Sequence, residues 1–223
     1  MKIEKTTYLR IGLLVITILI SGMVFSSLAE DLVNRETLSM LDPVFGGWLI
    51  AHTSLSGDYV FSVITFFGDV LIISIGTGLL SFWLAKRKNW NNLVFLFSAV
   101  GGSALLNLVL KNVFQRTRPV FPLAFLAYTG YSFPSGHTMI SLAFYGAVAY
   151  IALTYIKSRN WKILTVAGAL VVSVLIGFSR LYLGVHYLTD VLAGWAAGGL
   201  WLAVCVLGDY WFQYSKLQKV GSR

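Results

Sequence analysis

An arginine, a histidine and an aspartate lie between two long apolar runs, in the segment from Ser179 to Asp190. Asp190 follows His186 by four residues, so a helix that begins near His186 would place both side chains on one face. A carboxylate there can accept the Nδ1–H of the imidazole and leave Nε2 free and basic, which makes the histidine a candidate nucleophile. Arg180 adds a planar fork of N–H donors that suits phosphate oxygens.

A second polar segment has the sequence Pro-Ser-Gly-His and precedes another apolar run. Pro134 suits the first turn of a helix, and the backbone N–H groups of Ser135 and Gly136 at the helix N-terminus would form an anion site. Gly136 also lacks a side chain that would crowd a ligand. His137 would lie on the first turn, from which its imidazole could donate a proton to a bound group.

The third polar segment runs from Lys111 to Pro119. Arg118 follows Lys111 by seven residues, about two helical turns, so both side chains can share a face, whereas Arg116 could point elsewhere. Pro119 disfavours helix at Arg118 and ends the run. Two cations without an acidic neighbour in sequence indicate an anionic partner, although both could instead reach towards lipid headgroups.

The three segments together predict one phosphate site. The cations Lys111, Arg118 and Arg180, with backbone N–H donors, would neutralise the charge that a metal ion neutralises in other phosphoryl-transfer enzymes. The single cysteine, Cys205, lies in an apolar run, so the chain offers neither an internal disulfide nor a thiolate cluster for a metal. We therefore expect neither a metal nor another cofactor at this site.

The composition indicates that membrane helices position these segments. Hydrophobic residues make up 57% of the 223 residues and charged residues 12%, and the mean hydropathy is +0.76. Soluble domains carry roughly a quarter charged residues. The apolar runs are continuous over about 20 residues, which favours helices over a barrel. We predict one all-α domain, residues 1–223, with six spans: Tyr8–Leu28, Tyr59–Ala85, Leu93–Leu110, Thr138–Ile156, Ile163–Ser179 and Leu188–Phe212.

The orientation follows from the lysines and arginines of the loops, because these residues are concentrated on the cytoplasmic side. Twelve of the seventeen fall on one side of the predicted layout, at both termini and in the loops after the second and fourth spans. The prediction is a multi-pass plasma-membrane protein with both termini in the cytoplasm and the three polar segments outside it. A cleaved signal peptide ending near Ala29 is an alternative for the first span. The sidedness accounts for the net charge of +8, so nucleic acid is not expected as a partner.

Several residues outside the three segments have more than one interpretation. The linker 29–58 predicts a helix lying in the outer membrane interface, and its His52 is expected to have no catalytic part. Asp69, inside the second span, is either functional or a structural hydrogen-bond partner of a neighbouring helix. The apolar and aromatic segment 120–128 either packs as structure or lines a lateral entry for lipid.

The three segments resemble the signature motifs of the type 2 phosphatidic acid phosphatase superfamily, without a substitution and in the same order. They read Lys111 to Arg118-Pro119, Pro134 to His137, and Ser179-Arg180 to His186 and Asp190. The size and the outward site resemble the bacterial integral-membrane branch. The resemblance implies that His186 forms a phosphohistidine, Asp190 orients it and His137 protonates the leaving oxygen. It also implies that Lys111, Arg118, Ser135, Gly136 and Arg180 hold the phosphate, without a metal.

The expected activity is removal of phosphate from a membrane lipid phosphate on the outer face. Undecaprenyl pyrophosphate, phosphatidylglycerol phosphate, phosphatidic acid and diacylglycerol pyrophosphate are all candidate substrates, and no residue pattern indicates the oligomeric state. One alternative is a lipid phosphotransferase that uses the same phosphohistidine. Another is an anion or lipid transporter, which the clustering of charge at one face disfavours, because transporter sites lie near the bilayer midplane.

Overall fold

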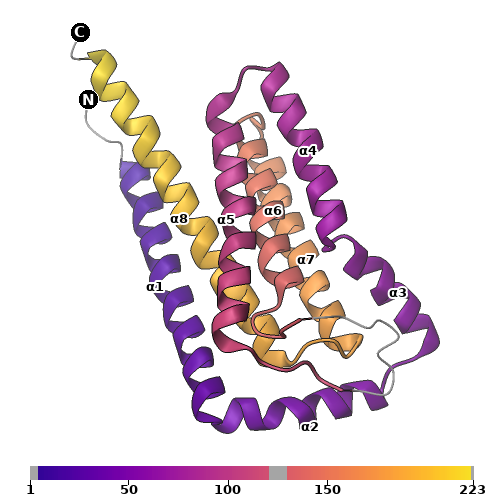
Figure 1. The fold of residues 1–223 in the computed structure, drawn as a ribbon. Helices are drawn as coiled ribbons and strands as arrows, with labels where there is room; N and C mark the ends of the chain where they lie inside the picture. The colour runs from indigo at the N-terminus through magenta and orange to yellow at the C-terminus, as the bar shows by residue number, and fades with distance from the viewer. Residues whose placement is uncertain (1–4, 121–129, 222–223) are drawn as a thin grey trace.

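The computed structural model describes residues 5–120 and 130–221, and this part of the chain forms eight helices connected by short segments (Figure 1). The helices are α1 (Lys5–Asn34), α2 (Thr37–Ala51), α3 (Leu55–Phe66), α4 (Val70–Lys86), α5 (Trp90–Phe114), α6 (Gly136–Leu153), α7 (Arg159–Tyr182) and α8 (Leu188–Gly221). Six segments are long and apolar enough to cross a membrane, with α3 and α4 together forming the second. The predicted all-helical fold with six spans is confirmed.

The second span is not the continuous helix that we predicted. It breaks between Phe66 and Val70, where the Asp69 carboxylate caps α4 by accepting the backbone N–H of Leu71 at 2.8 Å. Gly68 packs closely at the break, since an added Cβ would lie 2.5 Å from the Ile176 side chain. Asp69 is therefore a helix cap, and its partner is its own helix rather than a neighbouring one.

The linker after α1 forms α2, the helix expected between residues 29 and 58. Figure 1 shows α2 running across the end of the bundle, roughly perpendicular to α1. Asp31, near the end of α1, fixes the start of α2 because its carboxylate accepts the backbone N–H groups of Leu38 and Ser39 at 3.1 and 2.6 Å. Trp48 and other apolar side chains of α2 are exposed, whereas Asp42 and Leu49 are buried against the bundle. These features are typical of an interfacial helix.

The core of the bundle lies where α6 packs against α5, α7 and α8. Phe95 and Leu96 of α5, Phe144 and Ala147 of α6, and Val206 of α8 belong to one buried cluster. Around it, the lateral surface is apolar, as on α1, where a series of large side chains is exposed. A hydrophobic core surrounded by a hydrophobic surface is the arrangement expected in lipid, which solvates apolar side chains.

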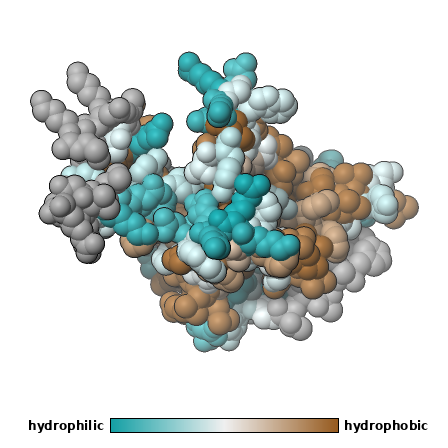
Figure 2. Space-filling model, turned by 90° about the horizontal axis from the view of Figure 1, so that it is seen from above, coloured by the Kyte–Doolittle hydropathy of each residue, from teal (hydrophilic) through white to brown (hydrophobic). Residues whose placement is uncertain are grey.

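The two ends of the bundle differ in character. Both termini and the α4–α5 and α6–α7 connections lie at one end, and the three polar segments lie at the other (Figure 1). Viewed onto the first end, hydrophilic residues gather across its surface (Figure 2). This end carries the basic residues of the α4–α5 connection and of the start of α7, which the charge pattern predicted to lie together.

Close approach of α8 to α6 depends on a glycine, which gives a test of the packing. An added Cβ at Gly198 would lie 2.8 Å from the backbone oxygen of Met139, whereas nothing lies within 4 Å of a Cβ added at Gly208 of the same helix. We expect Gly198→Ala to lower the stability by about 1–3 kcal/mol, because a backbone atom cannot swing aside. Gly208→Ala should leave it unchanged or raise it by up to about 1 kcal/mol. Thermal unfolding of both variants in detergent is the measurement, and equal melting temperatures would contradict this packing.

Candidate active site

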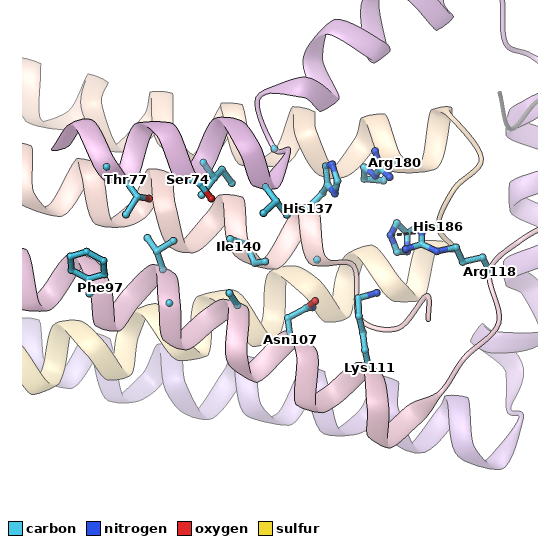
Figure 3. Close-up of a pocket in the computed structure, with 18 residues that line it drawn as sticks. Ser74, Thr77, Phe97, Asn107, Lys111, Arg118, His137, Ile140, Arg180 and His186 are labelled. Atoms are coloured by element: carbon cyan, nitrogen blue, oxygen red, sulfur yellow. Dashed lines mark hydrogen bonds between the residues drawn. The ribbon is translucent and has the colours of Figure 1, made fainter. Parts of the chain in front are cut away.

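A cavity of about 560 Å³ opens between α4, α5 and α6 and ends among the three polar segments. Figure 3 shows Lys111, Arg118, His137, Arg180 and His186 at one end of it. Six of the eight residues predicted for the site line this cavity: Lys111, Arg118, Gly136, His137, Arg180 and His186. The other two, Ser135 and Asp190, are fully buried beside it. The structure thus brings together residues that are up to 79 positions apart in the sequence.

His186 and Asp190 form the pair expected from their spacing. The imidazole Nδ1 lies 3.2 Å from Asp190 Oδ2, and Asp190 Oδ2 also accepts the backbone N–H of Tyr187 at 2.9 Å. That second bond is the reciprocal half of a capping box, because Asp190 is the third residue of α8 and Tyr187 precedes the helix. The same carboxylate therefore starts the helix and orients the imidazole.

The contacts of His186 indicate which nitrogen carries the proton. Nη1 of Arg118 lies 3.2 Å from His186 Nε2. A guanidinium group can only donate hydrogen bonds, so Nε2 must accept and Nδ1 must carry the hydrogen that faces Asp190. Burial lowers the pKa of His186 to about 3, against the hydrogen bond and charge of Asp190, which raise it. The imidazole is thus neutral at pH 7, with the Nε2 lone pair directed towards the cavity.

Asp190 has two further side-chain partners that the sequence analysis did not identify. Ser132 donates a hydrogen bond to Asp190 Oδ2 and lies 3.2 Å from His186 Nδ1. Arg116, which was expected to point elsewhere, forms an ion pair of 2.6 Å with Asp190 Oδ1 and one of 2.7 Å with Asp42 Oδ2. Burial disfavours the charge of Arg116, but the carboxylates of Asp190 and Asp42 more than compensate and raise its pKa.

Lys111 and Arg118 reach the cavity by a different route from the predicted shared helical face. Helix α5 ends at Phe114, and Gln115 adopts a left-handed conformation that turns the chain away. Lys111 Nζ donates to the backbone oxygen of Tyr131, and Arg118 Nη1 donates to that of Val185 at 3.0 Å. Backbone carbonyl oxygens therefore hold the two cations at the charged end of the cavity.

The Ser135–Gly136 step also differs from the expectation. The backbone N–H of Ser135, predicted to face an anion, donates instead to the backbone oxygen of Asp190 at 2.9 Å. A phosphate contact at Ser135 would therefore have to come from its hydroxyl group, which accepts a bond from Thr138 at 2.9 Å. Gly136 packs closely against α5, since an added Cβ would lie 3.0 Å from Asn107 Oδ1.

Arg180 is the largest fully buried side chain of the site. Its Nη1 donates to the hydroxyl group of Thr65 in α3 at 2.6 Å. Thr65 and Asn107 are thus further polar residues around the site that the motifs did not reveal. His52 does not line the cavity and contacts Trp48 on α2. The segment 121–129, expected to pack or to form a lipid entry, lies outside the described residues.

Chemically, the arrangement provides an oriented neutral imidazole, three cations and a second histidine at the end of a cavity. An Nε2 lone pair that meets the Arg118 guanidinium, in a site with further cations, suits attack on the phosphorus atom of a group whose oxygens carry negative charge.

Comparisons with known proteins agree with this chemistry. The model of the PAP2 superfamily matches residues 92–214, from the first turn of α5 to α8. A phosphatidylglycerophosphatase B of Bacillus subtilis is 40% identical over 132 residues, which are 57% of this chain and 61% of that protein. An undecaprenyl-diphosphatase of Sulfolobus acidocaldarius is 35% identical over 132 residues, 57% of this chain and 58% of that protein. The matches span less than two thirds of these relatives.

A solved structure extends the similarity to nearly the whole fold. The crystal structure of a transmembrane PAP2-type phosphatidylglycerolphosphate phosphatase from Bacillus subtilis has a TM-score of 0.79 and 28% identity, and the alignment covers 87% of this chain and 96% of that one. The layout of the membrane helices is therefore shared with that protein.

Proposed function

The chain belongs to the PAP2 superfamily, and from this membership we propose that it is a membrane lipid phosphatase that acts through a phosphohistidine at His186. The observation that carries the proposal is the Nε2 atom of His186, which faces the charged end of a cavity whose other end is apolar. A phosphate headgroup fits the charged end, and a lipid chain fits the apolar one. The type 2 phosphatidic acid phosphatase resemblance seen in the motifs is thereby confirmed at the level of the family.

The reaction proceeds in two steps. Nε2 of His186 attacks phosphorus, the bond between phosphorus and the leaving oxygen breaks, and His137 gives that oxygen a proton. The Asp190 carboxylate accepts the Nδ1–H of His186 and stabilises the positive charge that develops on the ring. Water then attacks the phosphohistidine and gives a proton to His137, which releases inorganic phosphate and restores both histidines.

The three cations hold the phosphate during both steps. Lys111, Arg118 and Arg180 line the charged end of the cavity, so they can neutralise the oxygens of a phosphoryl group next to His186. The Arg118 N–H that meets Nε2 can turn to a phosphate oxygen when the substrate enters. Fixed donors of this kind stabilise charge in the transition state without a metal ion.

The apolar part of the cavity points to a lipid. From His137 it continues along α4 and α5 past Ser74, Ile140 and Phe97, as Figure 3 shows. A substrate with a terminal phosphate group and at least one long apolar chain would occupy both parts at once. Undecaprenyl pyrophosphate, phosphatidylglycerol phosphate, phosphatidic acid and diacylglycerol pyrophosphate all have this form.

The position of the site in the membrane follows from the charge pattern. The end with both termini carries the basic loops, so we assign it to the cytoplasmic face of the plasma membrane. The His186 end then lies at the extracytoplasmic face, where a headgroup can enter while its chains stay in the bilayer.

Replacement of the nucleophile tests this function. His186→Ala should reduce phosphate release from a lipid phosphate by about 10⁴-fold or more, because loss of a covalent nucleophile leaves only binding and charge stabilisation. Wild-type activity should survive excess chelator. Phosphate release by purified protein in detergent, with each candidate lipid in turn, is the measurement. His52→Ala is the matched control, since this exposed histidine lies outside the cavity and should keep full activity. Activity retained in His186→Ala would exclude the proposed nucleophile.

A change in the apolar part of the cavity tests the binding of the lipid chain. Gly101 lines the cavity, and nothing lies within 4 Å of a Cβ added there, so a Gly101→Leu side chain would start in open space and take up room in the apolar part. We expect the KM for a long-chain lipid phosphate to rise at least about 10-fold, because a pocket that loses room for a few methylene groups discriminates by that order. A short-chain phosphate monoester should be hydrolysed as before.

Gly168→Leu is the control for this test. It introduces the same residue at another open glycine of a membrane helix, in α7 and outside the cavity, so KM should not change for either substrate. An equal rise of KM for long and short substrates in Gly101→Leu would show that the apolar part does not hold the chain.

A further inference from the structure

The guanidinium group of Arg116 bridges two buried carboxylates. Its Nη1 lies 2.6 Å from Asp190 Oδ1 and 2.7 Å from the Thr189 hydroxyl, and its Nη2 lies 2.7 Å from Asp42 Oδ2. The side chain is 10% exposed, and its guanidinium stacks over the Tyr187 ring at 4.1 Å. Arg116 thus connects the segment after α5 to both α2 and the start of α8.

Asp42 fixes the other end of this bridge. It is 2% exposed, and its Oδ1 accepts the backbone N–H of Thr189 at 3.1 Å while its Oδ2 accepts the Thr189 hydroxyl. Thr189 is the second residue of α8, so its N–H is one of those that have no partner within the helix. A carboxylate from α2 therefore caps the helix that carries Asp190, at the position where negative charge is favourable.

The two oxygens of Asp190 have separate partners. Oδ1 contacts Arg116, whereas Oδ2 accepts from Ser132 and Tyr187 and faces Nδ1 of His186. A planar guanidinium that is held at both ends fixes the plane of the carboxylate it contacts. With Oδ1 held in this way, Oδ2 stays directed at the imidazole.

Arg116 does not line the cavity that holds Lys111, Arg118 and Arg180, and it lies on the far side of Asp190 from His186. Its Nη1 and Nη2 atoms are both engaged by carboxylates. These features separate it from the cations that would touch phosphate, although it comes from the same sequence segment as two of them.

We propose that Arg116 is a positioning residue for the nucleophile, that it acts through Asp190, and that Asp42 of the interfacial helix α2 holds it in place. The proposal rests on the proposed function, because it needs His186 to be the nucleophile. Asp42 has a second effect: its charge balances part of that of Arg116, so Arg116 weakens to a smaller extent the hydrogen bond that Asp190 accepts from Nδ1–H of His186. Helix α2 is then part of the catalytic apparatus rather than only a membrane-surface element.

Conservative variants test the proposal through separate values of kcat and KM for phosphate release. Arg116→Lys keeps the charge but reaches only one of the two carboxylates, and Asp42→Asn keeps the size but loses the charge. We expect kcat to fall by about 10–100-fold in each, the loss that follows a small misplacement of a reacting group, with KM changed by less than about 3-fold.

Asp31→Asn is the matched control. Asp31 also ties α2 to the bundle, through the backbone N–H groups of Leu38 and Ser39, but it touches neither Arg116 nor Asp190. We expect it to keep kcat within about 2-fold of the wild type. An equal loss of kcat in Asp31→Asn would overturn the proposal, because any loosening of α2 would then have the same effect. A rise of KM with unchanged kcat in Arg116→Lys would also overturn it and identify a phosphate contact.

A double-variant comparison tests whether Arg116 acts through Asp190. The enzyme concentration is raised until the residual activity of Asp190→Asn can be measured. Adding Arg116→Lys to this variant should lower kcat by less than about a further 3-fold, because the group that Arg116 positions is already altered. Adding Asp42→Asn to Asp190→Asn should have the same small effect on kcat. Asp42→Asn replaces Arg116→Lys in this test if size-exclusion chromatography and thermal unfolding show that Arg116→Lys is not folded. Losses that multiply would overturn the proposal.

The same assay separates failure of this proposal from failure of the proposed function. If the wild type releases phosphate and His186→Ala does not, but Arg116→Lys and Asp42→Asn match the wild type, only the positioning role is refuted. If His186→Ala stays active, or the wild type releases no phosphate from any candidate lipid, the proposed function fails and the positioning role fails with it.

Discussion

The buried carboxylate of Asp190 is the charge on which the geometry of the site depends. An ion removed from water loses several kcal/mol of solvation, and a folded chain keeps it only if hydrogen-bond donors and opposite charge replace the solvent. Here the donors are Arg116, Ser132, the backbone N–H of Tyr187 and the imidazole of His186. The first three stabilise the carboxylate ion. The imidazole also donates to it, and the carboxylate in turn orients the imidazole as a nucleophile.

Those donors come from distant parts of the chain. Stabilising the charge of Asp190 therefore fixes the arrangement of several segments at this end of the bundle. The segments around Arg116 and Ser132 lie between α5 and α6, and they must fold back onto the start of α8 to reach the carboxylate. Ser132 is tied to Arg116 by a backbone hydrogen bond of 2.8 Å, so the two donors move together. Helix α2 lies against the same place, where Asp42 meets both Arg116 and Thr189.

The cavity joins this polar end to the apolar interior of the bundle. Its charged end is built from side chains that carbonyl oxygens and hydroxyl groups hold in place, such as Lys111 by Tyr131 and Arg180 by Thr65. Its apolar part follows α4 and α5. Helix α4 begins directly after the break at Gly68 and Asp69. One cavity thereby offers charge for a headgroup and room for a chain, as a lipid phosphate requires.

The sequence predicted the residues that face the cavity better than the residues behind them. His186 and Asp190 could be paired because four residues is a local, helical spacing, and the histidine motif lay at a predictable helix start. Asp42 and Arg116 are 74 positions apart, so no local pattern indicates their ion pair. Ser132 lies two residues before Pro134, outside the motif. The break in the second span did carry a signal, since glycine followed by aspartate is typical of a helix start, but the continuous hydropathy concealed it.

We expect the Asp190 carboxylate to make His186 the residue that becomes phosphorylated. The most direct test is to mix the enzyme with a lipid phosphate, quench within the first turnover, and locate the acid-labile phosphate by mass spectrometry of peptides. We predict phosphate on His186 in the wild type, and much less of it in Asp190→Asn at the same time point. Phosphate on His137, or turnover without any phosphohistidine, would contradict the account.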